Sequence, residues 1–187
     1  MSLDVKNLQI SDVKLISPKK IGDHRGFFSE TYNKSALSQA GIDIDFLQDN
    51  QSLSAEKGTM RGLHFQSPPF GQDKLVHVVR GSIFDVAVDL RRNSPTFGQH
   101  VSAVLSAESW AQILVPIGFA HGFMTLEPDT EVIYKVSNYY APDHDAGILW
   151  NDPALEIGWP LPAEMAVLSG KDHKQPLLQD IETPFDR

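Results

Sequence analysis

The chain has 187 residues, of which 41% are hydrophobic and 21% are charged, a balance typical of one globular domain. Its 16 Lys and Arg against 24 Asp and Glu leave a formal net charge of −8. This charge argues against a general nucleic-acid-binding protein, which needs a basic face, although a local basic cluster can still bind a small anion. The absence of Cys excludes disulfides, thiolate metal sites and a Cys nucleophile.

The first residues do not read as a signal peptide, because a basic stretch followed by an apolar one is missing. No apolar run approaches the roughly 20 residues that a membrane-spanning helix requires. We therefore expect a soluble cytoplasmic protein that has no membrane partner and binds no nucleic acid.

The first predicted element is a short helix. Ser35 is expected to cap a helix that starts at Ala36, and Gly41 is expected to end it. The chain that follows has the pattern of strands separated by Gly and Pro at short intervals. A second short helix is expected near residues 177–180.

The clearest predicted strand follows a tight turn at residues 80–81. Over residues 83–90 large apolar side chains recur at every second position, which predicts a strand buried on one face. Residues 110–115, 121–126 and 131–136 have similar patterns. Strands about every 8–12 residues predict a mostly antiparallel all-β sandwich or barrel with short helices at its margins. Jelly rolls of this kind often enclose a ligand cavity at the mouth of the barrel.

Residues 60–66 form another predicted strand, and this one contains titratable side chains. On a regular strand His64 would face away from Arg61, Leu63 and Phe65, because side chains alternate between the two faces. Taken alone, His64 could equally be a core or edge histidine whose ring nitrogens are satisfied by neighbours.

Four further polar features accompany predicted strands and turns. Lys74 opens a strand, His121 follows a Pro/Gly turn, and Tyr134 lies in the middle of a strand face. Residues 169–173 form a charged loop. Each has an ordinary explanation, such as an edge lysine with a buried stem, a turn residue, a packed aromatic or a solvent-exposed loop.

A metal site is another possible explanation of these histidines. The Pro-x-Gly-x-x-His pattern at residues 116–121 resembles the second motif of the cupin superfamily. Metal-binding cupins pair it with an earlier His-x-His and a Glu, whereas the earlier segment here has His64 and Gln66. Two histidines without a third ligand make a weak site for a divalent ion, and Lys74 nearby is unfavourable. We therefore expect no metal.

Eight segments carry a more specific signal. They lie at residues 22–30, 46–50, 60–66, 81–90, 94–98, 116–123, 134–140 and 148–152. In sequence and in order they resemble the dTDP-4-dehydrorhamnose 3,5-epimerases, and the resemblance runs over about residues 13–178. It implies a cupin-type jelly roll, a homodimer, a nucleotide-sugar substrate and no cofactor. We expect a single epimerase domain over residues 1–187, with a core jelly roll at about 45–140 and the terminal segments packed on it.

The resemblance also implies four catalytic roles. His64 resembles the general base, and Asp172 resembles the carboxylate that orients it. Tyr134 resembles the general acid, and Lys74 resembles the cation beside the sugar ketone. A cation near the phenol would be expected to lower the pKa of Tyr134.

Ten further positions resemble the substrate-binding residues of the family. They are Arg25, Phe28, Glu30, Gln48, Asn50, Arg61, His121, Tyr140, Asp145 and Lys171. Phe28 and Tyr140 resemble aromatic contacts to the thymine base. Asp145 stands where the family pattern has Glu, so its carboxylate is one methylene shorter.

The implied reaction is epimerisation of dTDP-4-dehydro-6-deoxy-D-glucose at C3 and C5 to dTDP-4-dehydro-L-rhamnose. The protons at both carbons are α to the C4 ketone, so their removal gives an enolate, and reprotonation from the other face inverts the centre. An imidazole suits this step because its ordinary pKa lies near neutral pH.

Three alternatives remain at this point. A single-site 3- or 5-epimerase of another dTDP-4-keto-deoxysugar would use the same residues. A non-catalytic sugar-binding cupin would need no base, acid and cation together. A metal-dependent cupin isomerase or dioxygenase is disfavoured by Gln66.

Overall fold

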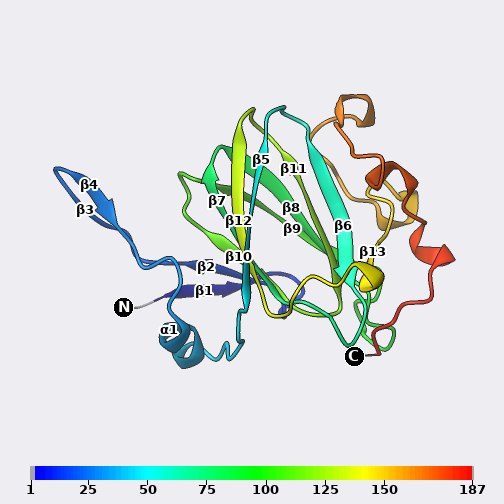
Figure 1. Cartoon of the computed structure of the whole chain (residues 1–187), viewed down its shortest axis with the longest axis horizontal. Coiled ribbons are helices and arrows are strands. Elements are labelled where there is room, and N and C mark those ends of the chain that lie inside the picture. Colours follow the sequence, from blue (N-terminus) through cyan, green and yellow to red (C-terminus); the bar gives the residue numbers. More distant parts are fainter. Residues whose placement is uncertain (1–2, 187) are drawn as a thin grey trace.

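The computed structural model describes residues 3–186, and its main body consists of two antiparallel sheets that face each other (Figure 1). The strands of the first sheet are β1 (Asp4–Asn7), β2 (Lys14–Ser17), β5 (Gln48–Ser54), β7 (Lys74–Arg80), β10 (Gln112–Val115) and β12 (Thr130–Val136). Those of the second are β6 (Met60–Gln66), β8 (Ser82–Asp89), β9 (His100–Ser106), β11 (Phe119–Thr125) and β13 (Asp145–Gly147). The strand orders are β1-β2-β10-β7-β12-β5 and β13-β6-β11-β8-β9. The predicted all-β, antiparallel architecture is confirmed.

The helices are short: α1 (Lys34–Gln39), η1 (Pro142–His144), η2 (Pro153–Leu155), η3 (Ala163–Met165), η4 (Asp172–Lys174) and η5 (Leu178–Asp180). Element η5 confirms the helix predicted near residues 177–180. The prediction of Ser35 as the cap of α1 was wrong. The side chain of Asn33 accepts from the backbone N of Ala36 at 3.1 Å, and an Asn carbonyl caps a helix at least as well as a Ser hydroxyl. Within residues 3–186, no helix is long and apolar enough to cross a membrane.

The main hydrophobic core fills the space between the two sheets. Val76 and Val132 enter it from the six-stranded sheet, and Ala87, Leu105 and Phe119 enter from the five-stranded sheet. All five are almost completely buried. Burying a large apolar side chain contributes about 1.5–3 kcal/mol, so this cluster holds the two sheets face to face.

Strand β8 is buried on both faces, whereas the sequence pattern predicted burial on one. Ile83 and Ala87 belong to the core between the sheets, but Val86 and Val88 belong to a second core on the outer side of the five-stranded sheet. The C-terminal segment supplies that second cover, for example through Trp150. Figure 1 shows this segment, in orange and red, running beside β6 and β13. The alternation of apolar and polar residues along one strand does not show that a distant segment of the chain packs on its second face.

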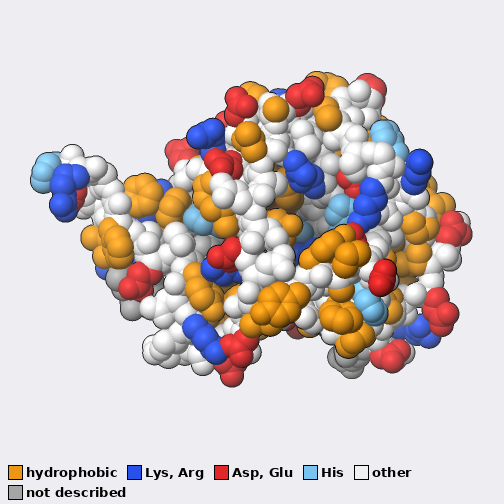
Figure 2. Space-filling view, in the orientation of Figure 1, with side chains coloured by type: hydrophobic (Ala, Val, Ile, Leu, Met, Phe, Trp, Pro, Cys, Tyr) orange, Lys and Arg blue, Asp and Glu red, His pale blue; other side chains and the backbone are white. Residues whose placement is uncertain are grey.

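A two-stranded hairpin, β3 (Ile21–Asp23) with β4 (Gly26–Phe28), projects from the main body (Figures 1 and 2). At its base the Phe27 ring packs edge-on against Trp110, with ring centroids 4.9 Å apart. Phe28 is nevertheless 59% exposed. The hairpin therefore presents large apolar side chains that the rest of the described chain leaves uncovered.

One irregularity in β6 decides which side chains reach the interior. His121 of β11 lies opposite His64, and Phe123 lies opposite Arg61, so the register shifts between the two pairs. As a result His64 and Arg61 both line one pocket, and the prediction that they face opposite ways was wrong. Leu63 does face away from His64, as predicted, and packs in the outer core.

Two glycines on the paired strands, Gly62 and Gly122, allow the shift in register because their backbones are in close contact. Gly62 has φ +134°, and a Cβ at this position would stand 2.5 Å from the Cα of Gly122. A Cβ on Gly122 would in turn stand 2.6 Å from the backbone O of Arg61. Any larger residue would therefore push the two strands apart where the pocket is built.

Candidate active site

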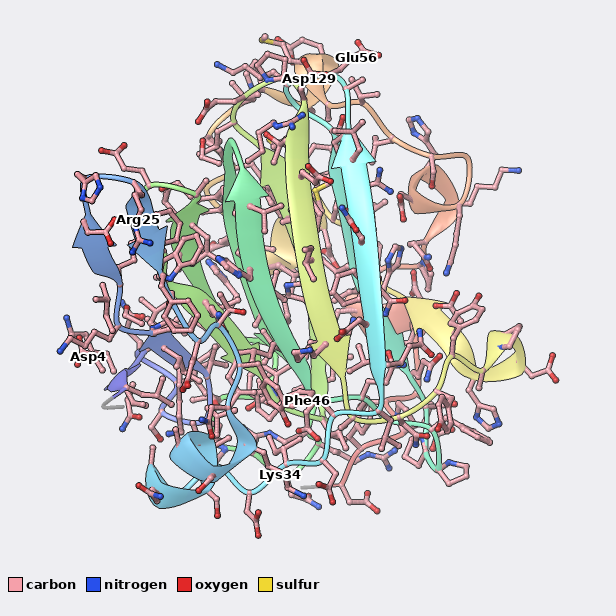
Figure 3. All side chains as sticks on the ribbon, turned by 60° about the vertical axis from the view of Figure 1, so that its left-hand side comes forward. Asp4, Arg25, Lys34, Phe46, Glu56 and Asp129 are labelled. Atoms are coloured by element: carbon pink, nitrogen blue, oxygen red, sulfur yellow. The ribbon has the colours of Figure 1, made fainter. Side chains whose placement is uncertain are left out.

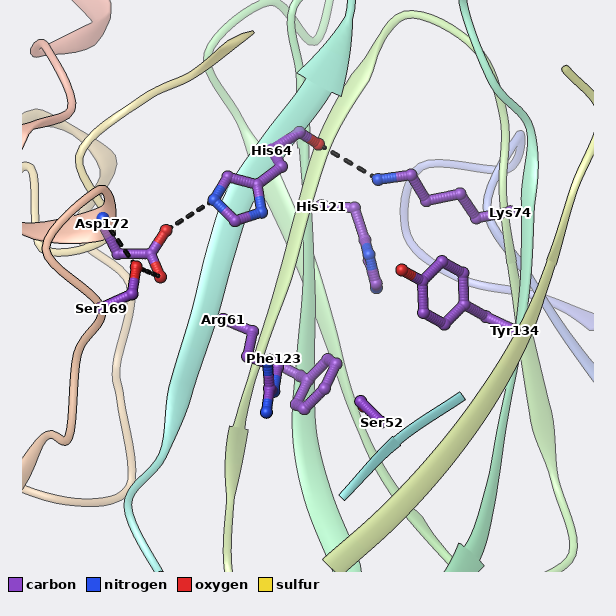
Figure 4. Close-up of a pocket in the computed structure, with 9 residues that line it drawn as sticks. All are labelled: Ser52, Arg61, His64, Lys74, His121, Phe123, Tyr134, Ser169 and Asp172. Carbon is purple, nitrogen blue, oxygen red and sulfur yellow. Dashed lines mark hydrogen bonds and ion pairs between the residues drawn. The ribbon is translucent and has the colours of Figure 1, made fainter. Parts of the chain in front are cut away.

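A cavity of about 250 Å³ lies between the inner faces of the two sheets (Figure 4). Nine residues line it: Ser52, Arg61, His64, Lys74, His121, Phe123, Tyr134, Ser169 and Asp172. They come from both sheets and from the C-terminal segment around η4. All four predicted catalytic residues are among them. A second lobe of about 260 Å³ shares His64, Lys74 and Tyr134 with the first.

His64 and Asp172 form a close pair although 108 positions separate them in the sequence. The Nε2 atom of His64 lies 2.5 Å from Oδ1 of Asp172. Asp172 is buried, and its Oδ2 accepts from the hydroxyl of Ser169 at 2.8 Å. Sequence reasoning missed Ser169 as a partner, although it lies only three residues from Asp172.

The ionisation of Asp172 determines which nitrogen of His64 can act as a base. Burial alone would raise the pKa of Asp172, but the hydrogen bonds from His64 and Ser169 outweigh it and hold this pKa below its ordinary value. An ionised carboxylate only accepts hydrogen bonds, so Nε2 of His64 carries the proton. The lone pair on Nδ1 is then free to take a proton from a ligand, and Figure 4 shows this nitrogen on the pocket side of the ring.

Lys74 supplies a half-buried ammonium group at the junction of the two lobes. Its Nζ donates to the backbone O of His64 at 3.3 Å. Burial lowers the pKa of Lys74 to about 8, while the charges of Asp145 and Asp85 oppose the shift. Lys74 is therefore still mostly charged at neutral pH.

Tyr134 approaches the cavity from the side opposite His64. It lies on β12 of the six-stranded sheet, whereas His64 lies on β6 of the five-stranded sheet (Figure 4). Burial raises the pKa of Tyr134, and the positive charge of Arg61 offsets this only in part. Arg61 thus has the lowering effect expected of a nearby cation, but burial is the larger effect and the pKa of Tyr134 stays above its ordinary value. The phenol keeps its proton and can donate it.

His121 lies next to His64 on the neighbouring strand and has its own carboxylate. Its Nε2 atom is 2.9 Å and 3.1 Å from the two side-chain oxygens of Asp85 on β8. Asp85 is fully buried. The alternating pattern over residues 83–90 assigns no role to Asp85. A charged residue in the middle of an otherwise apolar buried strand was the signal that could have identified it.

The second lobe collects five of the predicted substrate-binding residues: Gln48, Asn50, Tyr140, Asp145 and Lys171. The Asp145 carboxylate accepts from Lys171 Nζ at 2.5 Å and from the Tyr140 hydroxyl at 3.0 Å. The shorter Asp145 side chain thus still connects two of the predicted binding residues. The exposed Tyr140 ring offers this lobe a flat surface on which an aromatic base can stack.

Three other predicted binding residues do not reach either lobe. Arg25 and Phe28 lie on the projecting hairpin, where Figure 3 places Arg25, and they line a separate surface hollow. The Arg25 guanidinium pairs with Asp23 of its own hairpin at 2.5 Å. Glu30 accepts from the Asn33 side chain near α1.

Gln66, which replaces the second His of the metal-binding cupin pattern, is used structurally. Its side-chain amide donates to the backbone O atoms of Phe70 and Tyr139 and accepts from the backbone N of Ala141. Over residues 3–186, no three His, Cys, Asp or Glu side chains converge as a potential metal site.

A family model described as dTDP-4-dehydrorhamnose 3,5-epimerase matches residues 7–180. This chain belongs to that family. The resemblance predicted from the sequence is confirmed, and with it the assignment of the chain as an isomerase. Among curated relatives, the epimerase of Sinorhizobium fredii is 52% identical over 180 residues, which cover 96% of this chain and 92% of the relative.

Solved structures agree with this family assignment. The epimerase of Bacillus anthracis with TDP and PPi bound is 52% identical, with a TM-score of 0.91 and coverage of 94% of this chain and 99% of that one. The epimerase of Legionella pneumophila, solved in complex with dTDP-4-keto-L-rhamnose, is 46% identical, with a TM-score of 0.92 and coverage of 96% and 95%. The predicted cupin-type jelly roll of these epimerases is therefore confirmed for this chain.

Proposed function

We propose that this epimerase converts dTDP-4-dehydro-6-deoxy-D-glucose to dTDP-4-dehydro-L-rhamnose, with His64 as base and Tyr134 as acid. The observation that carries the proposal is their placement. The imidazole and the phenol extend from different sheets and meet across one cavity (Figure 4). Inversion of a carbon requires proton removal from one face and proton delivery to the other, which this arrangement supports.

The first step is removal of a proton α to the ketone by Nδ1 of His64. Asp172 fixes the ring through Nε2 and stabilises the imidazolium that forms, which is the orienting role of the carboxylate in a Ser-His-Asp triad. The electron pair of the broken C–H bond moves into the enolate, whose negative charge lies mainly on the C4 oxygen.

Lys74 is placed to stabilise that oxygen. Lys74 lines both lobes of the cavity, and its Nζ donates to the backbone O of His64. Removing one oxyanion-stabilising donor typically costs about 10²–10³ in rate, so this charge is a major contribution to catalysis. Tyr134 then protonates the carbon from the opposite face. Before the next proton transfer, His64 releases the proton it took to solvent, and the tyrosinate takes one proton back from solvent.

The second lobe is suited to the nucleotide. It combines the Tyr140 ring with Lys171 and the amides of Gln48 and Asn50. A diphosphate and a flat base need a cation, hydrogen-bond donors and a stacking surface. The solved Legionella pneumophila relative contains a dTDP-sugar, which supports a ligand of this class for the present chain.

We also propose that the protein acts as a homodimer. The hairpin exposes Ile21, Phe27 and Phe28 by 45–59%, an apolar surface that a second copy can cover. Association would also give Arg25 and Phe28, which resemble substrate-binding residues, a cavity other than the one in their own chain. The cytoplasmic location stays a prediction.

Deuterium exchange tests the reaction and its regiochemistry together. Incubation with dTDP-4-dehydro-6-deoxy-D-glucose in deuterated water should label both C3 and C5, as read by NMR. Label at one carbon only would support a single-site epimerase. Complete absence of label with intact ligand binding would support a non-catalytic sugar-binding cupin.

Two variants assign the roles in the same assay. His64→Ala should abolish exchange at both carbons, because the variant lacks the proposed base. Tyr134→Phe should slow inversion more than exchange, because proton removal needs only the base. Retained exchange in the His64 variant would remove this residue as the base. Equal loss of exchange and inversion in the Tyr134 variant would assign the tyrosine to binding.

A further inference from the structure

The segment that carries Tyr140 is held in place by side-chain amides and not by a neighbouring strand. The regular pairing of β12 ends at Val136, several residues before η1 begins. Between these two elements, Gln48 accepts from the backbone N of Tyr140 at 3.2 Å, and Gln72 donates to the backbone O of Asn138 at 2.8 Å. The position of this segment therefore depends on a few polar side chains.

Gln66, at the end of β6, ties the same segment to the loop that follows β6. Its Nε2 donates to the backbone O atoms of Phe70 at 2.7 Å and Tyr139 at 3.1 Å, and its Oε1 accepts from the backbone N of Ala141 at 2.8 Å. The bonds to Tyr139 and Ala141 hold the chain on both sides of Tyr140. Gln66 is only 4% exposed, so water competes little for these bonds.

These hydrogen bonds leave the Gln66 amide no donor for a ligand. Gln66 lines the second lobe, but both hydrogens of its Nε2 are already donated to backbone carbonyls. A neutral imidazole, which the metal-binding cupin pattern has here, offers one donor and one acceptor and could not make all three bonds. Gln66 therefore acts on a nucleotide through the segment that it holds.

The ring of Tyr140 has a second anchor. Its hydroxyl donates to Oδ2 of Asp145 at 3.0 Å, and Asp145 pairs with Gln66 in the register of β13 and β6. Tyr140 is nevertheless 58% exposed, so its ring is fixed at both ends without being covered. An aromatic ring that is ordered before a ligand binds loses less conformational entropy when the ligand stacks on it.

We propose that Gln66 is a positioning residue for nucleotide binding, which fixes the chain on both sides of Tyr140 so that the ring is ready to stack on the base of a nucleoside diphosphate. This inference rests on the proposed function and gives a task to a residue outside the proton-transfer groups. Because Gln66 moves no proton, its loss should weaken ligand binding and spare the chemical step.

The primary test is Gln66→Met, which keeps the length of the side chain and removes the amide. We expect the Kd for dTDP, measured by isothermal titration calorimetry, to rise about tenfold, because the ring must then be ordered during binding. KM should rise in the same proportion, whereas kcat at saturating substrate should change less than about threefold. A Kd that stays at the wild-type value, or a loss confined to kcat, would overturn the proposal.

The matched control is Thr183→Val, which also removes a buried hydrogen bond at nearly constant volume. The Thr183 hydroxyl donates to the backbone O of Leu90, and this residue lines neither lobe. The variant should lower the melting temperature and leave the Kd for dTDP unchanged. A similar rise in Kd in both variants would show that general destabilisation explains the effect, and it would contradict the proposal.

A double-mutant cycle tests whether Gln66 acts through Tyr140. Tyr140→Ala alone should raise the Kd for dTDP about tenfold or more, the usual cost of losing one stacked aromatic ring. In that background Gln66→Met should have almost no further effect, because the ring that it positions is already absent. Independent, multiplicative effects of the two substitutions would refute this role.

Hydrogen exchange on the unaltered protein keeps the inference testable if Gln66→Met does not fold. The backbone amide of Ala141, bonded to Oε1 of Gln66, should exchange at least about 100-fold more slowly than an unprotected amide in the absence of ligand. An unprotected amide would mean that the segment is not ordered in advance, and the inference would fail. Because dTDP binding and amide exchange need no turnover, a protein that binds dTDP but epimerises no sugar would refute the proposed reaction and not this inference.

Discussion

At the scale of single residues, the charge on Lys74 should control how the rate depends on pH. The cation is needed to stabilise the enolate, and burial lowers the pKa of this amine to about 8. The charged form is therefore lost as the pH rises through about 8. We expect kcat/KM of the free enzyme to decrease about tenfold per pH unit above that value.

The Lys74→Arg variant provides the comparison. Its guanidinium stays protonated across this range, so the alkaline decrease should disappear even if the variant is slower overall. The measurement is kcat/KM between about pH 6 and pH 10 for both proteins. A wild-type profile that is flat through pH 9, or the same decrease in the Arg variant, would assign the pH dependence to another group.

At the scale of elements, the site depends on the register of β6 against β11. Gly62 and Gly122 allow the shift that turns both His64 and Arg61 inward. In Gly62→Ala, the new Cβ would meet the backbone of Gly122, and the residue would have to adopt a positive φ. We expect a loss of at least about 1 kcal/mol in the free energy of unfolding together with a strong loss of activity.

Chemical denaturation and steady-state rates measure these two effects. Gly158→Ala is the control, because a Cβ there has no neighbour within 4 Å and its φ is not positive. This control should be neutral. A Gly62 variant as stable and active as the Gly158 variant would show that the shifted register does not depend on glycine.

At the scale of the whole molecule, the exposed hairpin predicts self-association. We expect sedimentation or light scattering to give twice the mass of the 20.8 kDa chain. Phe28→Asp should weaken the dimer, because it places a charge in an interface that would otherwise bury an aromatic ring. Glu182→Ala is the control, since its side chain is 89% exposed and lies far from the hairpin in the sequence. A monomeric wild-type protein would contradict the prediction.

The antiparallel all-β class could be predicted from strand periodicity and turn residues alone. The family and the four proposed catalytic side chains could be predicted from the resemblance of eight sequence segments to known epimerases. Two departures were also visible in the sequence: Gln66 replaces a His of the metal-binding cupin pattern, and Asp145 replaces a Glu of the epimerase pattern.

Which of these residues share a cavity became clear from the three-dimensional fold. It separated Arg25 and Phe28 from the pocket of their own chain, turned Arg61 inward, and joined Asp85 to His121. The physical reason is that such outcomes depend on contacts between distant segments. A shift in register, cover from the C-terminal segment and the burial of a charge all depend on which strands become neighbours, and a single strand pattern does not contain that information.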